Sequence, residues 1–425
     1  MREFVPDRAQ AVVEEVAAFF CTGSAEFRAN PCRFAAQLLD AGPVHRLPGG
    51  TVVVLGHREA DRVLRDPRFG HGAAKLYETT LLGLRARSFM QLDAPVHAWM
   101  RGRVSPYFAA HRVSALREVV GQHARALVDE CAGREAEFVT DFAEPLAMSV
   151  IADLLGVPPQ DRERFHHDSR LVVRGLDDAA HSTPAPDVAR ARYRFVRYFH
   201  RLAELRGREP GDDVVSAMRQ PYREHGGAST AELVTTCGLL LSAGFETTVD
   251  LLGSAVLQLA RLPEEAGWRL AERPGTLAAV VEETLRLHPP VQLTFRGALT
   301  DAEIDGIPVR AGTLVGVILA AANRDPAVHD DPHAFRPERH LMPPRRERGR
   351  PSVRHLAFGA GPHFCLGAAL GRLEARTALA ALAPRRPRLT NAPWAYKDTL
   401  TVRGLDRLPV HWRTAHAPTL PGAQT

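Results

Sequence analysis

The sequence predicts a mainly α-helical protein that carries small β-sheets. Two observations support this prediction: long segments place apolar residues at helical spacing, and the segments with strand character are short. The composition agrees, because 45% of the 425 residues are hydrophobic and 24% are charged, which is ordinary for a globular chain with a large core. Disordered, collagen-like and disulfide-stapled proteins are therefore excluded.

The first predicted elements are a strand and a helix, followed by a long helical stretch. The strand covers 52–54, and the helix covers 58–65 and ends at Asp66-Pro67. Later, apolar residues recur every four positions on one face of a helix that ends at Gly156: Phe142, Leu146, Val150 and Leu154. The polar, proline-containing segment 175–188 is expected to be an exposed loop between two helices.

A long buried helix is predicted to begin at the capping box Ser229-Thr230-Ala231-Glu232 and to continue to about residue 261, since this stretch is apolar almost all round. A further helix over 275–287, short strands within 306–317, a last long helix after Cys365 and a strand at 408–410 complete the pattern. No linker divides the chain. We therefore expect one domain over 1–425, with peripheral segments at 1–30 and 412–425.

The charge pattern argues against nucleic-acid binding. The formal net charge is +5, and 52 of the 54 basic residues are arginine, because only Lys75 and Lys397 are lysine. The arginines are scattered among acids, and only 343–350 is locally dense, whereas a nucleic-acid binder gathers its positive charge. The five cysteines are far apart and form no C-x-x-C pair, so we expect reduced thiols. No signal peptide or membrane span is evident, which predicts a cytoplasmic protein without a membrane contact.

The glycine-rich segment 358–367 delivers one cysteine to the start of the last predicted helix. A thiolate there is stabilised by free backbone N–H groups and by the helix dipole, so Cys365 should be a good anionic ligand. The spacing F-x-x-G-x-x-x-C-x-G resembles the haem-thiolate signature of the cytochrome P450 family at four positions: Phe358, Gly361, Cys365 and Gly367. One departure is Ala360, where bacterial members often have histidine.

The resemblance implies the cytochrome P450 fold, with haem b held between the long central helix and the cysteine loop with its last helix. Cys365 would be the proximal iron ligand, whose electron donation favours O–O cleavage. The residues implied to line the haem beside it are Phe358, Gly359 and Gly367. Small residues here let the backbone approach the sulfur and donate hydrogen bonds to it.

Further motifs occur in the family's order. Glu283 and Arg286 match the family's E-x-x-R, and a spacing of three places both side chains on one helix face. By resemblance they form a buried structural pair that Arg339 completes, and losing one partner of such a pair is strongly destabilising.

The segment 243–248, Ala-Gly-Phe-Glu-Thr-Thr, places an acid and two hydroxyls inside the long apolar helix. One interpretation is structural: the threonines bond back to carbonyls four residues earlier, and Glu246 pairs with an arginine. The resemblance favours another, in which Ala243 and Gly244 lie against the haem and the helix opens locally at Gly244 to make room for O2. Thr247 and Glu246 would then relay protons to the bound oxygen.

Several cations match the family's positions for the two haem propionates. His97 and Arg101 lie one turn apart on one predicted helix face and fit its H-x-x-x-R pattern. Arg296 and His355 match two further positions, so the resemblance implies that these residues hold the propionates.

The implied reaction is reductive activation of O2, with one oxygen atom inserted into a C–H bond or an alkene of a small-molecule substrate. Electrons are expected from a ferredoxin and its reductase, and we expect a monomer. Ferredoxins are acidic, so Arg103, Arg372 and Arg376 could steer their docking.

The family's substrate-contact segments are largely apolar in this chain, which indicates a bulky hydrophobic substrate and suggests a tailoring step on a secondary metabolite. The predicted pocket residues are Leu81, Leu82, Phe89, Leu240, Val291, Leu293, Thr294 and Leu400.

Two alternatives remain at this point. The first is a haem-thiolate enzyme for oxidative coupling or peroxide-driven oxidation, which needs no acid–alcohol relay. The second is a non-catalytic haem-binding sensor or partner protein, which would be expected to lose the cysteine, the E-x-x-R pair or the relay. This chain retains all three.

Overall fold

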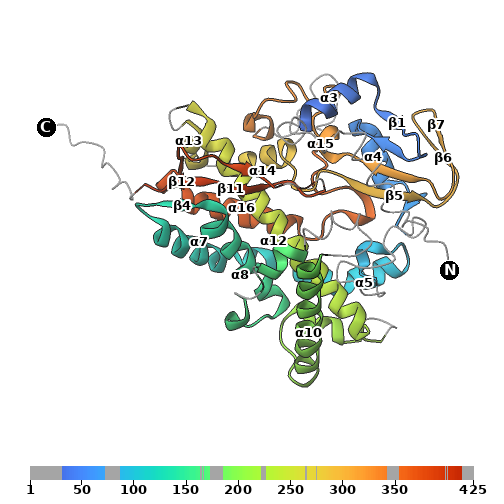
Figure 1. The fold of residues 1–425 in the computed structure, drawn as a ribbon. Coiled ribbons are helices and arrows are strands. Elements are labelled where there is room, and N and C mark those ends of the chain that lie inside the picture. The colour runs from blue at the N-terminus through green and yellow to red at the C-terminus, as the bar shows by residue number, and fades with distance from the viewer. Residues whose placement is uncertain are drawn as a thin grey trace.

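The computed structural model describes residues 31–71, 87–162, 165, 167–172, 185–221, 226–263, 266–273, 275–341, 354–397, 399 and 401–413. Helices make up most of this part of the chain, as predicted (Figure 1). The α-helices are α3 Pro31–Ala41, α4 His57–Arg65, α5 Val96–Val104, α6 Ala110–Ala115, α7 Arg117–Cys131, α8 Glu144–Leu155, α10 Pro186–Arg208, α11 Val214–Arg219, α12 Thr230–Arg261, α13 Ala266–Glu272, α14 Thr276–Leu287, α15 Leu319–Ala322 and α16 Ala368–Leu382.

The strands are short and form small sheets. They are β1 Val44–Arg46, β2 Val52–Val54, β3 Phe69–Gly70, β4 Glu135–Glu137, β5 Thr294–Ala298, β6 Ala302–Ile304, β7 Ile307–Val309, β8 Leu314–Val317, β9 Arg388–Leu389, β10 Ala395–Tyr396, β11 Leu405–Arg407 and β12 Pro409–His411. The largest sheet has the order β1-β2-β8-β5-β3, so it joins the blue N-terminal strands to the orange strands in Figure 1. β2 and β8 run parallel, and the other pairs in this sheet are antiparallel.

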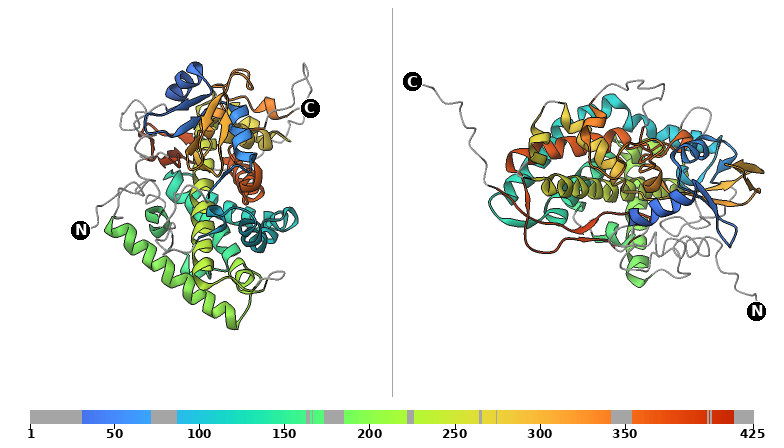
Figure 2. Two further views of the ribbon diagram at one scale, coloured as in Figure 1. Left: turned by 90° about the vertical axis from the view of Figure 1, so that its right-hand side faces the viewer. Right: turned by 90° about the horizontal axis from the view of Figure 1, so that it is seen from above.

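α12 is the central element of the fold. Its capping box is present, since Ser229 accepts a hydrogen bond from the Glu232 N–H and Glu232 accepts one from the Ser229 N–H. The helix packs against α8, α10 and α16 and crosses the middle of the molecule in Figures 1 and 2. By length and hydropathy α12 could cross a membrane, but 78% of its most apolar window is buried in the protein. It is a core helix, as its all-round apolar pattern predicts.

Most predicted elements have the expected bounds, and two expectations need correction. The predicted loop 175–188 ends earlier than expected, because α10 already begins at Pro186 and Val188 is buried in it. Residues 175–184 of that loop lie outside the described part. Trp412 is not peripheral. Its ring is fully buried and lies 5.7 Å from that of Phe142 and 6.2 Å from that of Phe138, so the core extends to this residue.

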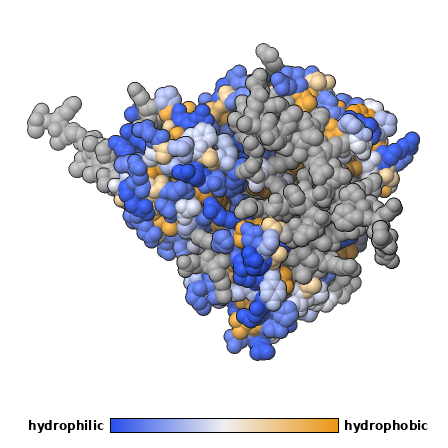
Figure 3. All heavy atoms as spheres, viewed as in Figure 1, coloured by the Kyte–Doolittle hydropathy of each residue, from blue (hydrophilic) through white to orange (hydrophobic). Residues whose placement is uncertain are grey.

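The outer face is polar where α7 and α10 lie. On the side shown in Figure 3, hydrophilic residues cover most of the described surface at the left and the bottom, and the hydrophobic areas there are small. On α10, exposed arginines at Arg190, Arg197 and Arg201 contribute to this surface.

Glu374 is a carboxyl group buried in α16. Within the described part of the chain its Oε2 atom has no hydrogen-bond partner, and burial raises the pKa of Glu374 well above its ordinary value. The folded protein therefore keeps a proton that the unfolded chain releases above about pH 4.3. This group lowers stability as the pH rises, because the unfolded state is favoured when it loses the proton.

We expect Glu374→Gln to remove this pH-dependent penalty, because the amide has the shape of the protonated carboxyl group and does not ionise. The gain in the free energy of unfolding over the wild type should grow by about 1.4 kcal/mol per pH unit above roughly pH 4.3, until the folded pKa is reached. Denaturant unfolding at several pH values measures it. The exposed Glu303→Gln is the control, and a gain independent of pH would contradict the assignment.

Candidate functional site

The loop before α16 is built from tight turns that present Cys365. Gly359 and Gly361 have φ values of +65° and +69°, which glycine adopts readily. A Cβ added at Gly361 would lie 2.3 Å from the Leu64 carbonyl oxygen of α4, so this position also needs the absence of a side chain. The Cys365 N–H donates to the Phe358 carbonyl (2.8 Å), which closes the loop.

Cys365 differs in exposure from Cys131 and Cys237. Cys131 and Cys237 are buried, whereas Cys365 is exposed. The surrounding protein nevertheless desolvates its sulfur on the other sides, and this burial raises the pKa of the Cys365 thiol. The Gly367 N–H and the charges of Arg101 and Arg372 act in the opposite direction and favour the thiolate. A bound metal ion would deprotonate such a thiol outright.

A cluster of three histidines and two arginines, the His–Arg cluster, lies beside the cysteine loop: His71, His97, His363, Arg101 and Arg296. The His363 ring lies 4.2 Å from that of His97 and 4.5 Å from that of His71, measured between centroids. Burial lowers the pKa of His71 to about 2 and that of His363 to about 3, and the nearby charge of Arg296 lowers both further. These rings are therefore neutral without an anion beside them.

The cluster suits the carboxylate groups of a haem. His97 Nε2 is buried and has no hydrogen-bond partner among the described residues, so this nitrogen is available to bind a haem propionate. Arg101 Nη2 donates to the Phe364 carbonyl (2.6 Å), which ties this cation to the residue beside Cys365. Arg296 is buried at the same site and acts on His71 and His363 through its charge. An exposed thiol next to such donors fits the thiolate iron ligand and the propionate partners of haem b.

Sequence reasoning missed His71 and His363. His363 could have been found, since it stands two residues before Cys365 in the cysteine loop. His71 gave no such signal, because β3 brings it to the cluster from a distant part of the chain.

His355 is held by protein partners in the structure. Its Nε2 atom lies 3.1 Å from Glu282 Oε2, and its Nδ1 accepts from the Ala357 N–H (3.2 Å). The propionate role of His355 stays a prediction. It would require the imidazole to give up its hydrogen bond to Glu282 and to bind a haem propionate instead.

The centre of α12 presents an open face in an otherwise buried helix. Ala243 is exposed and Thr247 is half-buried. The expected opening of the helix at Gly244 is wrong for this structure, because α12 continues through it. Gly244 instead permits close packing, since an added Cβ would lie 2.8 Å from the Ile151 Cδ1 of α8. The Thr247 hydroxyl donates back to the Ala243 carbonyl (2.6 Å), as the structural interpretation expects.

Glu246 is buried and pairs with a lysine. Its Oε1 accepts from Lys397 Nζ, which also donates to Asp250 Oδ1 at 2.6 Å. The expected arginine partner is therefore wrong. Lys397 comes from the hairpin of β10 and β11, about 150 residues along the chain, and no local pattern connects it to Glu246.

The E-x-x-R pair is fully buried and lies at the centre of a hydrogen-bond network. The Glu283 carboxylate accepts from Arg286 (2.9 and 2.8 Å), from Arg339 Nε (3.0 Å) and from the Arg336 N–H (2.9 Å), and His340 Nε2 lies 2.8 Å away. The expected contact with Arg339 is present, and His340 is an additional partner. The remaining Arg286 donors reach the carbonyls of Asn323, Pro332 and Ala334.

All three arginines expected to receive a ferredoxin have partners within the protein, and Arg376 Nε donates to the Arg372 carbonyl (3.0 Å). Arg103 is buried and donates to the carbonyls of Met218, Gln220 and Gly226, so its predicted surface role is wrong. Arg372 forms a two-pronged ion pair with Glu282 (2.6 and 2.8 Å) and lies 4.4 Å over the Phe358 ring. Arg376 is half-buried and shares its neighbourhood with the charge of Arg117.

The predicted substrate residues separate into groups. Phe89 and Leu240 belong to the main core, and Val291 forms a β-bridge with Val402. Leu293 packs with Val53, Leu55 and other residues in a separate hydrophobic cluster, and its pocket role stays a prediction. Thr294 begins β5, where its hydroxyl lies 3.3 Å from Arg296 Nη1. Leu81, Leu82 and Leu400 lie outside the described residues.

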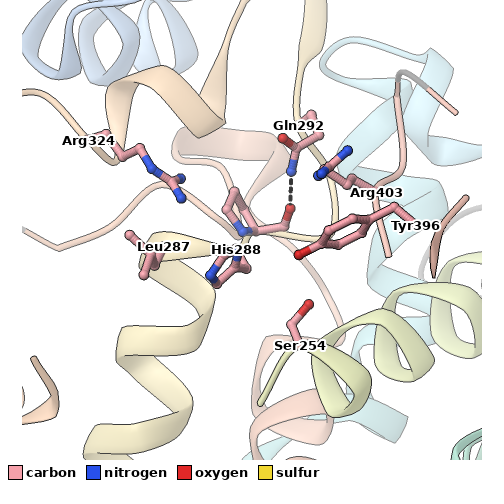
Figure 4. Close-up of a pocket in the computed structure, with 8 residues that line it drawn as sticks. Ser254, Leu287, His288, Gln292, Arg324, Tyr396 and Arg403 are labelled. Atoms are coloured by element: carbon pink, nitrogen blue, oxygen red, sulfur yellow. Dashed lines mark hydrogen bonds between the residues drawn. The ribbon is translucent and has the colours of Figure 1, made fainter. Parts of the chain in front are cut away.

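A small pocket lies between α12, the end of α14 and the C-terminal hairpin (Figure 4). Ser254, His288, Arg324, Tyr396 and Arg403 line it, together with Leu287, Pro289 and Gln292. None of these residues belongs to the cysteine loop or to the His–Arg cluster, so this pocket is separate from the candidate haem site.

Comparisons with known proteins agree with this geometry. The cytochrome P450 family model matches residues 275–383. The biotin biosynthesis cytochrome P450 of Bacillus subtilis is 32% identical over 401 residues, which cover 92% of this chain and 98% of that protein. The 20-oxo-5-O-mycaminosyltylactone 23-monooxygenase of Streptomyces fradiae is 35% identical over 399 residues, which cover 91% of this chain and 88% of that protein.

Solved structures show the same similarity. P450BioI in complex with acyl carrier protein ligated to hexadec-9Z-enoic acid has a TM-score of 0.81 at 31% identity, and the match covers 91% of this chain and 100% of that chain.

Proposed function

Because the chain belongs to the cytochrome P450 family, we propose that it oxidises a bulky, largely hydrophobic small molecule in a tailoring step of secondary metabolism. The family gives its general activity: it is a monooxygenase, an oxidoreductase with haem b as cofactor. The Streptomyces relative is named for such an oxidation, which supports the proposed substrate class. The apolar character of the predicted substrate-contact residues, among them Phe89 and Leu240, supports it further.

The exposed Cys365 beside Arg101 is the observation that carries the proposal. When bound, haem b supplies the activation of O2 and the transfer of one oxygen atom to the substrate. Cys365 would hold the iron, and Arg101, Arg296 and His97 would hold the propionates.

Two residues at the centre of α12 would handle protons, Thr247 on its open face and the buried Glu246. The Thr247 hydroxyl can give up its bond to the Ala243 carbonyl and donate toward the reacting oxygen, since hydroxyl groups rotate freely. Glu246 lies one residue earlier and would return the proton to Thr247. Electrons would come from an acidic ferredoxin and its reductase, with Arg376 as the remaining predicted candidate for its docking surface and the exposed Arg117 beside it. We propose that the protein acts as a monomer in the cytoplasm.

The test combines a substrate search with one variant. Compounds that shift the haem spin state are identified first, and product formed per electron consumed is then measured for the wild type and for Thr247→Ala. We expect the variant to lose about tenfold to a hundredfold in this ratio, because positioned proton transfer contributes at least that much. Binding of the substrate should not change.

Ser149→Ala is a matched control, because the Ser149 hydroxyl of α8 makes an equivalent bond to the Pro145 carbonyl (2.8 Å). Full coupled turnover by Thr247→Ala would refute the relay and would favour peroxide-driven or coupling chemistry.

A further inference from the structure

Three carboxylates and two cations meet between α8, α12 and the C-terminal hairpin. α12 contributes Glu246 and Asp250, one turn apart, and α8 contributes Glu144. The cations are Lys397, which follows β10, and Arg170, which belongs to the helical segment 167–172. We call these five residues the carboxylate cluster. All three acids are at most 6% exposed.

Lys397 connects the two acids of α12. Its Nζ donates to Glu246 Oε1 and to Asp250 Oδ1, while Arg170 Nε pairs with Glu144 Oε1 at 2.6 Å. Asp250 Oδ2 has no partner within the described part of the chain. The hairpin holds Lys397 in place through its backbone bond to the Gly404 carbonyl (3.0 Å).

Gly404 lets this hairpin approach α12 closely. A Cβ at this position would lie 1.7 Å from Asp250 Oδ1, so only glycine fits between the hairpin and the helix. The contact of the lysine with both acids is therefore built into the backbone of the hairpin.

The charges of the cluster do not balance when every group is ionised. Three carboxylates face two cations, which leaves one negative charge uncompensated in a buried place, and such a charge is costly. Taking up one proton removes it. Burial raises the pKa of Asp250 to about 7, and Glu246 and Glu144 raise it while Lys397 lowers it. Burial likewise raises the pKa of Glu144 to about 7, against the lowering effect of Arg170.

Lys397 stays charged in this environment. Burial alone would lower the pKa of Lys397, but Asp250 and Glu246 raise it above the ordinary value. The proton that the cluster holds therefore resides on the carboxyl groups.

We propose that the carboxylate cluster stores one exchangeable proton for Glu246, and that Lys397 is the positioning residue that sets this number. A proton leaving Glu246 toward the open face of α12 is replaced by the proton held at Asp250 or Glu144, and the cluster then recovers one from water. The proposal rests on the proposed relay role of Glu246. A purely structural lysine would only tie the hairpin to α12, and its loss would lower stability without changing the proton count.

Two variants should change the proton content of the carboxylate cluster at neutral pH in opposite directions. Lys397→Met removes a cation, so the acids should hold their proton to a higher pH, with a midpoint raised by about one to three pH units. Asp250→Asn removes the uncompensated acid and leaves two carboxylates against two cations, so the stored proton should be lost at neutral pH. Lys397→Arg keeps the charge and is the control.

Infrared titration of the carbonyl stretch of protonated carboxyl groups measures this without turnover. The wild type should show a band that titrates near pH 7, shifted upward in Lys397→Met and missing from that range in Asp250→Asn. The absence of such a band in the wild type, or an unchanged midpoint in Lys397→Met that still folds, would overturn the proposal.

Turnover gives a second measurement, in which the pH dependence should shift in the same direction as the infrared band. Product formed per electron should fall as the pH rises through the cluster midpoint, and Lys397→Met should move this fall upward by the same one to three pH units or so. If the relay role fails, Thr247→Ala and Glu246→Gln keep full coupling while the infrared band remains. If only the store fails, those variants lose coupling while Lys397→Met leaves the pH profile unchanged.

Discussion

We expect Cys365→Ser to abolish the thiolate-type Soret band of the ferrous–CO complex and to reduce monooxygenase activity to background. A serine hydroxyl is a far weaker anionic ligand than a thiol, because it does not ionise at neutral pH and donates less electron density to iron. The Gly367 N–H and the charges of Arg101 and Arg372 favour the anionic form of a thiol at this position. They are too weak to ionise a serine hydroxyl. The spectrum of the reduced protein under CO measures the change directly.

The control for this variant is Cys131→Ala, which removes a buried thiol from the core beside Asp141. It should keep the thiolate band, since Cys131 is buried away from the cysteine loop among α7 and its neighbours. A thiolate band that persists in Cys365→Ser would refute the assignment of the iron ligand.

The sequence was sufficient wherever the signal was local. The Ser229–Glu232 capping box marks the start of α12, and the glycines before Cys365 mark the turns of its loop, because caps and turns depend on residues within a few positions of each other. The mainly helical class followed from helical spacing in the same way, and the structure and the relatives confirm it.

Side-chain partners that come from distant segments could not be predicted from the sequence. Lys397 reaches Glu246 from a hairpin at the far end of the chain, and Arg103 turns inward to three carbonyls although its position suggested a surface residue. Both outcomes depend on how distant segments pack, which one sequence does not specify. A charged residue buried in this way has few alternatives to the partner that the fold brings to it.

The network around Glu283 supports the second large prediction. Burial alone would raise the pKa of Glu283, but hydrogen bonds from Arg286 and His340 outweigh this and lower it from 4.5 to about 2. At 1.36 kcal/mol per unit, this shift corresponds to about 3 kcal/mol of stability. Because the folded pKa is the lower one, this stability is fully present above about pH 4.5 and is lost as the pH falls toward 2.

Glu283→Gln should therefore lower the free energy of unfolding by about 3–5 kcal/mol at neutral pH, since it leaves the fully buried Arg286 without a countercharge. The difference from the wild type should shrink on acidification from about pH 5 toward pH 2, because the wild type then loses the same ion pair. Denaturant unfolding at both ends of this range measures it.

The exposed Glu338→Gln, in the turn that also carries Arg339, is the matched control and should leave stability within about 0.5 kcal/mol. A Glu283→Gln penalty that stayed constant down to pH 2 would show that shape, and not charge, is what this network needs. The side-chain partners of Glu283 in the described residues are Arg286, Arg339 and His340, and none of them is a predicted haem contact. The loss of Glu283 should therefore reduce the amount of folded protein that binds haem before it changes the spectrum of the haem that is bound.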